Sequence, residues 1–253
     1  MLTRLENYYD SVPRSAARAE EFGPLTLFVR EGEGWPYYAR PALGHTGEVP
    51  VAAVEKVRAR QRELGVPEAF EWVAETTPGL RAAVEASGLV VHAHPLMVLS
   101  APAEAVPDLP EGITVRRVDA GDPGLASAVA APYAAFGMSP APGAAEQLAA
   151  RLTAGLTRLA AAFDASGTAL AAGQHQPVGA VSEVVGVGTR PEARRRGLGL
   201  AVTAALVADA RALGVETVFL SATDADVARL YARLGFRTVG TALIAEPAGD
   251  ETA

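Results

Sequence analysis

The fold is decided by one stretch, which reads Val181-Ser-Glu-Val-Val-Gly-Val-Gly-Thr189, then Arg190-Pro-Glu-Ala, then Arg194-Arg-Arg-Gly-Leu-Gly199. Its first nine residues are mostly β-branched or apolar, which is typical of a buried strand, and Pro191 ends that strand. From Leu198 onward, apolar residues recur at helical spacing. Gly214 stands where a left-handed C-terminal cap is favoured. The stretch therefore predicts a strand, an Arg- and Gly-rich turn, and a helix.

The turn has the composition of an anion site. The first amides of a helix lack intrahelical partners and carry the positive end of the helix dipole. Gly197 and Gly199 leave room for a ligand beside the backbone, and three arginines add positive charge, which suits a phosphate or pyrophosphate. The alternative is a basic loop that begins an ordinary helix. A dinucleotide fingerprint starting at Gly186 does not fit, because its third glycine is Pro191, and the chain has no Gly-Lys-Ser/Thr nucleotide loop.

Two motifs in order resemble one family. Arg194, Gly197 and Gly199 fill the pattern Arg/Gln-x-x-Gly-x-Gly/Ala after a strand, as in the GNAT superfamily of acetyl-CoA-dependent N-acetyltransferases. The segment Ala228–Phe236 is similar to that family's Ala-x-x-Tyr-x-x-x-Gly-Phe helix and turn. The resemblance covers roughly Gly112 to Glu246. It implies an α/β (α+β) fold in which helices flank a mixed β-sheet, with acetyl-CoA as co-substrate.

The resemblance also implies a set of cofactor-binding positions. The strand is expected to bind the pantetheine arm along its edge, and the turn to bind the pyrophosphate through backbone amides. The Val187 amide is expected to donate to the acetyl carbonyl. Asp224 stands where the family often has an asparagine that contacts the cofactor, but it can equally be only a helix N-cap. The implied residues are Val187, Gly188, Thr189, Arg194, Arg195, Arg196, Gly197, Leu198, Gly199, Leu200 and Asp224.

Glycines inside the strand need an explanation of their own. Gly186 and Gly188 suit a β-bulge or the close approach of a ligand. The alternative is that they only relieve packing.

Two side chains are candidates for catalysis. Glu183 is a lone carboxylate in an apolar strand. Its separation from Gly197 along the sequence matches that of the general-base glutamate in histone-type members of the family. Alternatively, Glu183 is a solvated residue or is paired with an arginine. Tyr231 is the candidate general acid for the departing thiolate, or else a half-buried aromatic residue. The chain has no cysteine, which excludes an acetyl-cysteine route. Direct attack by the bound amine is then expected, unless a less usual nucleophile takes part.

The histidines give weaker signals. His92 and His94 point to one face of a predicted strand, but no cysteine or nearby carboxylate completes a metal site, so we expect no metal. His175 lies at the end of a predicted strand shortly before Glu183, where it could relay a proton, line the acceptor pocket or simply be structural.

Composition bounds the remaining possibilities. The net charge of −7 over 253 residues argues against binding nucleic acid. No signal region and no apolar run of membrane-spanning length is present, so we expect a cytoplasmic protein that does not associate with membranes. The sequence does not indicate an oligomeric state or the acceptor amine.

The first part of the chain shows a weak internal repeat of the second. Leu64-Gly65-Val66, a strand, a helix and Gly88-Leu89 parallel Leu213-Gly214-Val215, a strand, a helix and Gly235-Phe236. The first copy lacks the Arg-x-x-Gly-x-Gly turn and has Val84 in the place of Tyr231. We therefore predict a degenerate GNAT-like domain over residues 1–105 and an N-acetyltransferase domain over residues 106–253, joined by a Pro-rich linker at 101–111.

The expected elements of the first domain begin with a helix over Leu2–Phe22. A hairpin of Leu25–Arg30 and Trp35–Ala39 follows, and the chain is expected to end in a disordered tail over Glu246–Ala253.

Three functions fit these features. The first is transfer of an acetyl group to a primary amine of a small molecule or protein. The second is a non-catalytic regulator of the same fold that binds acetyl-CoA, and the third is an interaction protein without a cofactor. Release of thiol from acetyl-CoA in the presence of amines would distinguish the first from the second, and a lack of binding would indicate the third.

Overall fold

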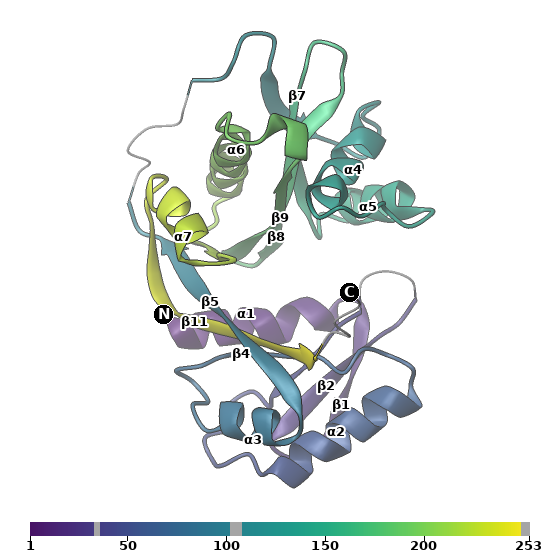
Figure 1. The fold of residues 1–253 in the computed structure, drawn as a ribbon, viewed down its shortest axis with the longest axis vertical. Helices are drawn as coiled ribbons and strands as arrows, with labels where there is room; N and C mark the ends of the chain where they lie inside the picture. The colour runs from purple at the N-terminus through teal and green to yellow at the C-terminus, as the bar shows by residue number, and fades with distance from the viewer. Residues whose placement is uncertain (33–35, 102–107, 249–253) are drawn as a thin grey trace. The chain divides into compact units, whose positions relative to one another are not determined.

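The computed structural model describes residues 1–32, 36–101 and 108–248 (Figure 1). The chain forms two compact units: unit 1 comprises Met1–Leu96 and Thr238–Ala253, and unit 2 comprises Met97–Arg237. The boundary between them lies within two strands, β5 (Leu89–Leu99) and β11 (Phe236–Pro247), so each strand contributes residues to both units. The predicted domain boundary at 105/106 and most of the predicted linker lie outside the described residues. The mixed α/β class predicted from the sequence is confirmed.

Unit 1 contains three helices and the larger parts of β5 and β11 within its described residues. Its strand order is β1-β2-β3-β4-β11-β5. The β1–β2, β2–β3 and β4–β11 pairs are antiparallel, whereas β3 and β4 are parallel. Its other elements are α1 (Leu2–Arg14), β1 (Ala17–Glu21), β2 (Leu25–Arg30), β3 (Ala39–Pro41), α2 (Val51–Glu63), β4 (Phe70–Val73) and α3 (Leu80–Ala86).

The helix expected over Leu2–Phe22 is wrong in its second half. The helix ends at Arg14, one residue after Pro13, and Ala17–Glu21 forms an edge strand antiparallel to β2. These five residues are alanine, arginine and glutamate, which have little strand propensity. They form a strand because their backbone pairs with that of β2. An antiparallel β2–β3 pair is present, but its second strand is Ala39–Pro41 and not Trp35–Ala39. Residues 36–38 lie outside any strand, and Trp35 lies outside the described residues.

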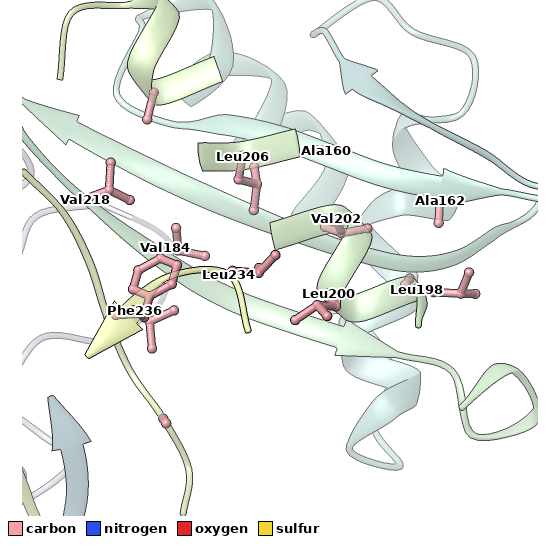
Figure 2. Packing of buried hydrophobic residues seen from close by; sticks show 14 of the residues in the cluster. Ala160, Ala162, Val184, Leu198, Leu200, Val202, Leu206, Val218, Leu234 and Phe236 are labelled. Carbon is pink, nitrogen blue, oxygen red and sulfur yellow. The ribbon is translucent and has the colours of Figure 1, made fainter. Parts of the chain in front are cut away.

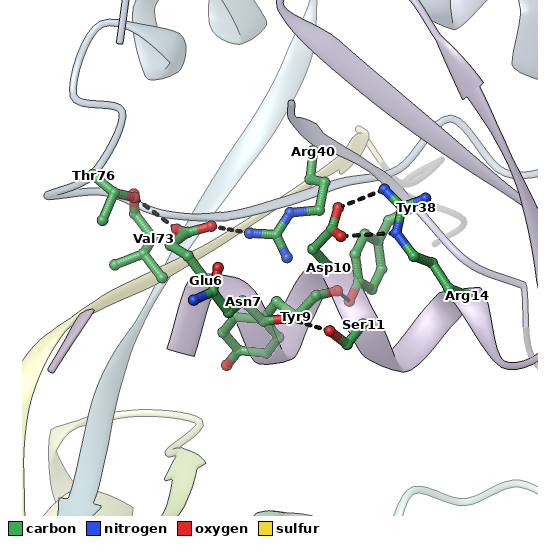
Figure 3. Close-up of polar contacts among 10 residues, drawn as sticks. All are labelled: Glu6, Asn7, Tyr9, Asp10, Ser11, Arg14, Tyr38, Arg40, Val73 and Thr76. Carbon is green, nitrogen blue, oxygen red and sulfur yellow. Dashed lines mark hydrogen bonds and ion pairs between the residues drawn. The ribbon is translucent and has the colours of Figure 1, made fainter. Parts of the chain in front are cut away.

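A buried arginine ties α1 to the sheet of unit 1 (Figure 3). Arg40 on β3 is 1 % exposed and forms an ion pair with Glu6 of α1. The other oxygen of Glu6 accepts a hydrogen bond of 2.7 Å from the Thr76 hydroxyl. On the neighbouring strand, burial raises the pKa of the Glu71 carboxyl to about 7, and Arg40 opposes this shift. Charges that are buried in this way are tolerated only when they are paired, so removal of either Arg40 or Glu6 alone should destabilise unit 1.

Unit 2 carries the stretch that opened the sequence analysis. Its strand order is β10-β9-β8-β7-β6, with β9 and β10 parallel and the other neighbours antiparallel. Its elements are β6 (Thr114–Val118), α4 (Leu125–Ala135), α5 (Ala144–Thr153), β7 (Arg158–Phe163), β8 (Ala169–Val178), β9 (Val181–Thr189), the short 3₁₀ helix η1 (Pro191–Ala193), α6 (Leu198–Ala212), β10 (Thr217–Ser221) and α7 (Ala225–Ala232).

Helices cover both faces of this sheet, and alternate strand residues belong to different cores. Ala160 and Ala162 of β7 pack with α6 and α7, whereas Leu159 and Phe163 of the same strand pack with α4 and α5. Figure 2 shows the first of these cores, to which Leu198, Val202 and Leu206 of α6 contribute together with Val184 of β9 and Val218 of β10. This packing fixes the start of α6 beside the end of β9.

The structure repeats the succession that the sequence suggested. In unit 1, α2 connects the parallel strands β3 and β4, as α6 connects β9 and β10 in unit 2. Both helices end with the same cap: the amides of Gly65 and Val66 donate to Arg62 and Gln61 carbonyls, and those of Gly214 and Val215 donate to Arg211 and Ala210 carbonyls. The two halves of the chain therefore share a local plan.

In the described ranges, every helix is too short or too polar to cross a membrane.

Candidate active site

Strands β9 and β10 separate soon after they begin. They pair from Val181↔Thr217 to Glu183↔Phe219, after which β9 continues to Thr189 and β10 ends at Ser221. Beyond Glu183, the edge of β9 that faces β10 therefore has no strand partner in the described part of the chain. Its backbone groups can bind an extended ligand as a further strand would.

A β-bulge interrupts the same region of β9. Ala172 pairs with Gly188 and Gln174 with Val185, so Gly186 and Val187 together face the single residue Gly173. Gly186 has φ +60°, and a Cβ at this position would meet no atom within 4 Å. The bulge predicted at Gly186 is confirmed, and its cause is backbone conformation rather than crowding.

Gly188 has a different role from Gly186. A Cβ on Gly188 would lie 2.6 Å from Cα of Pro132 in α4, far inside contact distance. Of the two explanations that the sequence left open, the structure supports packing for Gly188: the helix lies directly on the strand. A contact between Gly188 and the cofactor stays a prediction, as it does for Val187 and Thr189.

The turn between β9 and α6 winds through two left-handed residues. Arg195 has φ +60°, the only positive φ of a non-glycine residue in the described ranges, and the helix N-cap Gly197 has φ +76°. The first helical bond runs from the Ala201 amide to the Gly197 carbonyl. The backbone amides that precede Ala201 in the turn and the first turn of α6 therefore have no partner within the helix. Backbone amides next to residues with left-handed conformation commonly form a concave anion-binding site, called a nest.

The three arginines of the turn differ in their surroundings. The Arg194 guanidinium donates to the Ala135 carbonyl at the end of α4, at 2.5 Å, and lies 3.5 Å from the Thr189 carbonyl. All three arginines are exposed. The side chain of Arg194 braces the turn against α4, and Arg195 and Arg196 add positive charge beside it.

Gly199 allows the first turn of α6 to lie close to β9. Its added Cβ would be 3.3 Å from Oγ1 of Thr189 and 3.8 Å from Cγ1 of Val187. The buried Thr203 hydroxyl donates to the Gly199 carbonyl at 2.9 Å. The neighbouring side chains Leu198 and Leu200 are buried in the core, so only their backbone can face a ligand.

Tyr231 lies on α7 and packs against the same core. Its ring contacts that of Phe236 edge to face, with centroids 6.1 Å apart. Burial raises the pKa of the Tyr231 phenol, against an opposing effect of its contact with the Thr203 hydroxyl. A phenol with a raised pKa is fully protonated near neutral pH, which is the state that a general acid needs.

Asp224 is the N-cap of α7. Its Oδ1 accepts a hydrogen bond of 2.8 Å from the Val227 amide. The capping role that the sequence offered as an alternative is therefore present, and contact with the cofactor stays a prediction.

Glu183 occupies the point at which the two parallel strands separate. It pairs with Gln176 of β8 on one side and Phe219 of β10 on the other, and it is half-buried. Val187, the bulge residue, lies four positions further along the same strand. The candidate base and the candidate oxyanion donor thus lie on the same strand, on either side of the point where Gly186 begins the bulge.

His175 is buried in a polar chain that the sequence did not reveal. It is 0 % exposed, and its ring nitrogens lie 2.8 Å from Ser182 Oγ and 2.9 Å from Asp209 Oδ2. Burial lowers the pKa of His175, although Asp209 acts to raise it. His175 therefore links β8, β9 and α6 from inside the core and does not line an acceptor pocket. His92, by contrast, is exposed and lies 3.7 Å from Glu246.

The buried His175 should make stability depend on pH. Its folded-state pKa lies below the ordinary 6.5, so the unfolded chain binds the proton more strongly. The free energy of unfolding should then fall as pH falls from about 6.5 toward the folded-state pKa, with a slope of at most about 1.4 kcal/mol per pH unit from this group. Urea unfolding of wild type and His175→Gln across this window measures the difference in slope. His92→Gln is the control, and equal slopes in wild type and His175→Gln would contradict the expectation.

Comparison with known proteins identifies solved structures with a similar fold. Residues 162–243 match a family model described as FR47-like protein. The fold is similar to a GCN5-related N-acetyltransferase from Kribbella flavida, with TM-score 0.73 and 24% identity, over 99% of this chain and 97% of that one. It is also similar to a GCN5-related N-acetyltransferase from Sphaerobacter thermophilus, with TM-score 0.65 and 20% identity, over 91% and 84%. No curated protein matches the chain.

The fold is also similar to that of a third solved structure. It is described as a tandem GNAT protein from the clavulanic acid biosynthesis pathway, with TM-score 0.59 and 18% identity, over 90% of this chain and 79% of that one. The fold of this chain is thus that of the GCN5-related N-acetyltransferases, as the sequence motifs implied.

Proposed function

We propose that the protein is an acetyl-CoA-dependent N-acetyltransferase that moves an acetyl group to a primary amine by direct attack. The observation that carries the proposal is the edge of β9 that β10 leaves open, ending at the left-handed turn before α6. One element suits an extended amide-bearing arm and the other a pyrophosphate, so together they fit coenzyme A.

The chain's own residues divide the work as follows in this proposal. Amides of the turn Arg194–Leu200 hold the pyrophosphate, with Arg195 and Arg196 adding positive charge. Backbone groups of Val187, Gly188 and Thr189 bind the pantetheine arm, and the Val187 amide donates to the acetyl carbonyl. Acetyl-CoA supplies an activated acetyl thioester when it is bound.

Proton movement falls to two side chains. Glu183 accepts a proton from the ammonium group of the acceptor, so that the neutral amine becomes a nucleophile. Tyr231, which is protonated near neutral pH, gives its proton to the sulfur that leaves. With the amine as nucleophile, no covalent enzyme intermediate is needed, in keeping with a chain that has no cysteine.

We assign residues 106–253 to the catalytic domain and residues 1–105 to a degenerate second copy, with β11 from Thr238 onward completing the sheet of the first copy. Val84, which takes the place of Tyr231 in the first copy, is 0 % exposed and belongs to the core of unit 1. The first copy also lacks an Arg-x-x-Gly-x-Gly turn. The alternative is a non-catalytic regulator of the same fold, and the presence of both the Arg194–Gly199 turn and Tyr231 in unit 2 favours the catalytic function over it.

Binding of acetyl-CoA tests the cofactor site directly. Acetyl-CoA should raise the melting temperature of the wild type, because a ligand that binds only the folded state stabilises it. Gly197→Glu should remove this rise, since it puts bulk and negative charge at the nest. The control is Gly214→Glu, which imposes the same left-handed strain at φ +80° on the far end of α6. Loss of the rise in both variants, or in neither, would place the cofactor elsewhere.

A further inference from the structure

A buried hydroxyl in the core of unit 2 has no part in the function proposed above. Thr203 of α6 is 0 % exposed and stands beside Val202, which belongs to the apolar core. Its hydroxyl donates to the Gly199 carbonyl at 2.9 Å. In a regular helix that carbonyl already accepts the backbone amide of the residue four positions further on, which is Thr203 itself. The hydroxyl bond therefore satisfies no group that would otherwise lack a partner, and a valine of the same shape would avoid burying a polar group.

The second neighbour of this hydroxyl is the phenol of Tyr231 on α7. A hydroxyl has one proton to donate and two lone pairs that accept. Because a carbonyl oxygen can only accept, the Thr203 proton is directed at Gly199, and the Thr203 oxygen is left to accept a hydrogen bond from the phenol. The result is a directed chain from the Tyr231 hydroxyl through the Thr203 hydroxyl to the Gly199 carbonyl.

This chain ends at the turn of α6 that lies against β9. Gly199 and Thr203 are four positions apart and so share one face of the helix. A Cβ on Gly199 would lie 3.3 Å from Oγ1 of Thr189, in the part of β9 that β10 leaves open. The ring of Tyr231 contacts Phe236, and its oxygen contacts Thr203. Two contacts at different ends of the side chain therefore orient the phenol beside the proposed cofactor site.

The same contact acts differently once the phenol has lost its proton. Burial raises the pKa of the Tyr231 phenol, and the Thr203 hydroxyl opposes this rise. A neighbour lowers the pKa of a phenol when it donates a hydrogen bond to the phenolate. Rotation about one bond lets the Thr203 hydroxyl leave the Gly199 carbonyl and donate to the phenolate oxygen, and the carbonyl keeps its helical amide. Hydrogen bonds to an ionised oxygen are roughly twice as strong as neutral ones.

We propose that Thr203 is a positioning residue for Tyr231, which accepts a hydrogen bond from the phenol in the resting protein and donates one to the phenolate formed during acetyl transfer. This inference rests on the proposed role of Tyr231 as general acid. As the sulfur leaves, the phenol O–H bond breaks and an S–H bond forms, so the negative charge stays on the phenolate. Thr203 keeps its own proton throughout, and water returns a proton to the phenolate after the thiol has left.

Steady-state kinetics of variants at position 203 test this role. Thr203→Val removes the hydroxyl and keeps the shape of the side chain. It should lower kcat by about tenfold and leave the Michaelis constant for acetyl-CoA nearly unchanged, because a hydrogen bond to a charged group is lost. Thr203→Ser keeps the hydroxyl and should retain most of kcat. In the Tyr231→Phe background, Thr203→Val should lower kcat no further, since its effect requires the phenol.

Thr157→Val is the matched control for Thr203→Val. It removes the hydroxyl of another threonine of unit 2 that is 0 % exposed, and this hydroxyl donates to Gln174 rather than to a phenol. The control should keep the wild-type kcat.

A titration that needs no acceptor amine tests the contact itself. The tyrosines of the intact protein are replaced by 3-fluorotyrosine, whose more acidic phenol titrates under milder conditions, and the ¹⁹F signal of Tyr231 is assigned by its loss in Tyr231→Phe. Because the Thr203 hydroxyl favours the phenolate, Thr203→Val should raise the pKa of this phenol above its wild-type value. Thr203→Ser should keep the wild-type titration.

The two measurements separate failure of this inference from failure of the proposed function. An unchanged titration in Thr203→Val would overturn the role of Thr203, whether or not the protein transfers acetyl groups. A raised pKa with the wild-type kcat, or an equal loss of kcat in Thr203→Val and Thr157→Val, would overturn it as well. If the titration shifts but wild type releases no thiol from acetyl-CoA with a panel of amines, the proposed function fails, and the role of Thr203 in acetyl transfer fails with it.

Discussion

Replacement of Tyr231 by phenylalanine is expected to lower kcat by about 10²–10⁴, the usual contribution of a general acid. The ring contact with Phe236 survives this change, so the core of unit 2 should be kept. The Michaelis constant for acetyl-CoA should change much less than kcat, because the phenol acts on the leaving sulfur. Steady-state rates with an identified amine measure both quantities.

The Tyr231→Phe variant also has an internal control. Its rise in melting temperature with acetyl-CoA should equal that of wild type. A variant that binds acetyl-CoA normally and also keeps the wild-type kcat would show that the phenol is only a packing group.

Replacement of Glu183 by glutamine is expected to lower kcat/KM by a similar factor of about 10²–10⁴ at neutral pH. A general base works only when it is deprotonated, so the wild-type rate should rise with pH through the titration of Glu183. Glutamine cannot accept the proton, and this rising part of the pH–rate profile should disappear.

Glu192→Gln provides the matched control for Glu183→Gln. It removes the same charge from an exposed residue of η1, close to the phosphate turn. If both variants lose the same activity, the effect comes from net charge near the cofactor and not from a base at position 183.

Local sequence patterns predicted the parts of the fold that depend on local physics. Helix α6 begins at Leu198 and is capped at Gly214 as expected, since spacing and a left-handed glycine are visible in the sequence. The bulge at Gly186 could be suggested from the sequence because a glycine inside a strand is a local signal. Strand β1 was missed, because Ala17–Glu21 becomes a strand only through its pairing with β2.

Long-range contacts account for what the sequence did not reveal in the candidate site. The crowding at Gly188 comes from Pro132, and the carbonyl that holds Arg194 belongs to Ala135, both in a helix far earlier in the chain. Asp209 is hydrogen-bonded to His175 although the two residues are 34 positions apart in the sequence, so no local sequence pattern could predict this pair. The sequence motifs mark where the backbone can meet a ligand, whereas the supporting side chains depend on the tertiary fold.

Strand β11 has a consequence for the order in which the chain can fold. In unit 1 it lies between β4 and β5, with Ala242 beside Val73 and Leu243 beside Trp72. Leu243 is buried in the core of that unit, so residues 1–96 lack an inner strand until β11 has been synthesised. Domains usually fold from the N-terminus as they leave the ribosome. Here residues 1–96 must wait until all of unit 2 and then β11 have been synthesised before unit 1 can complete its sheet.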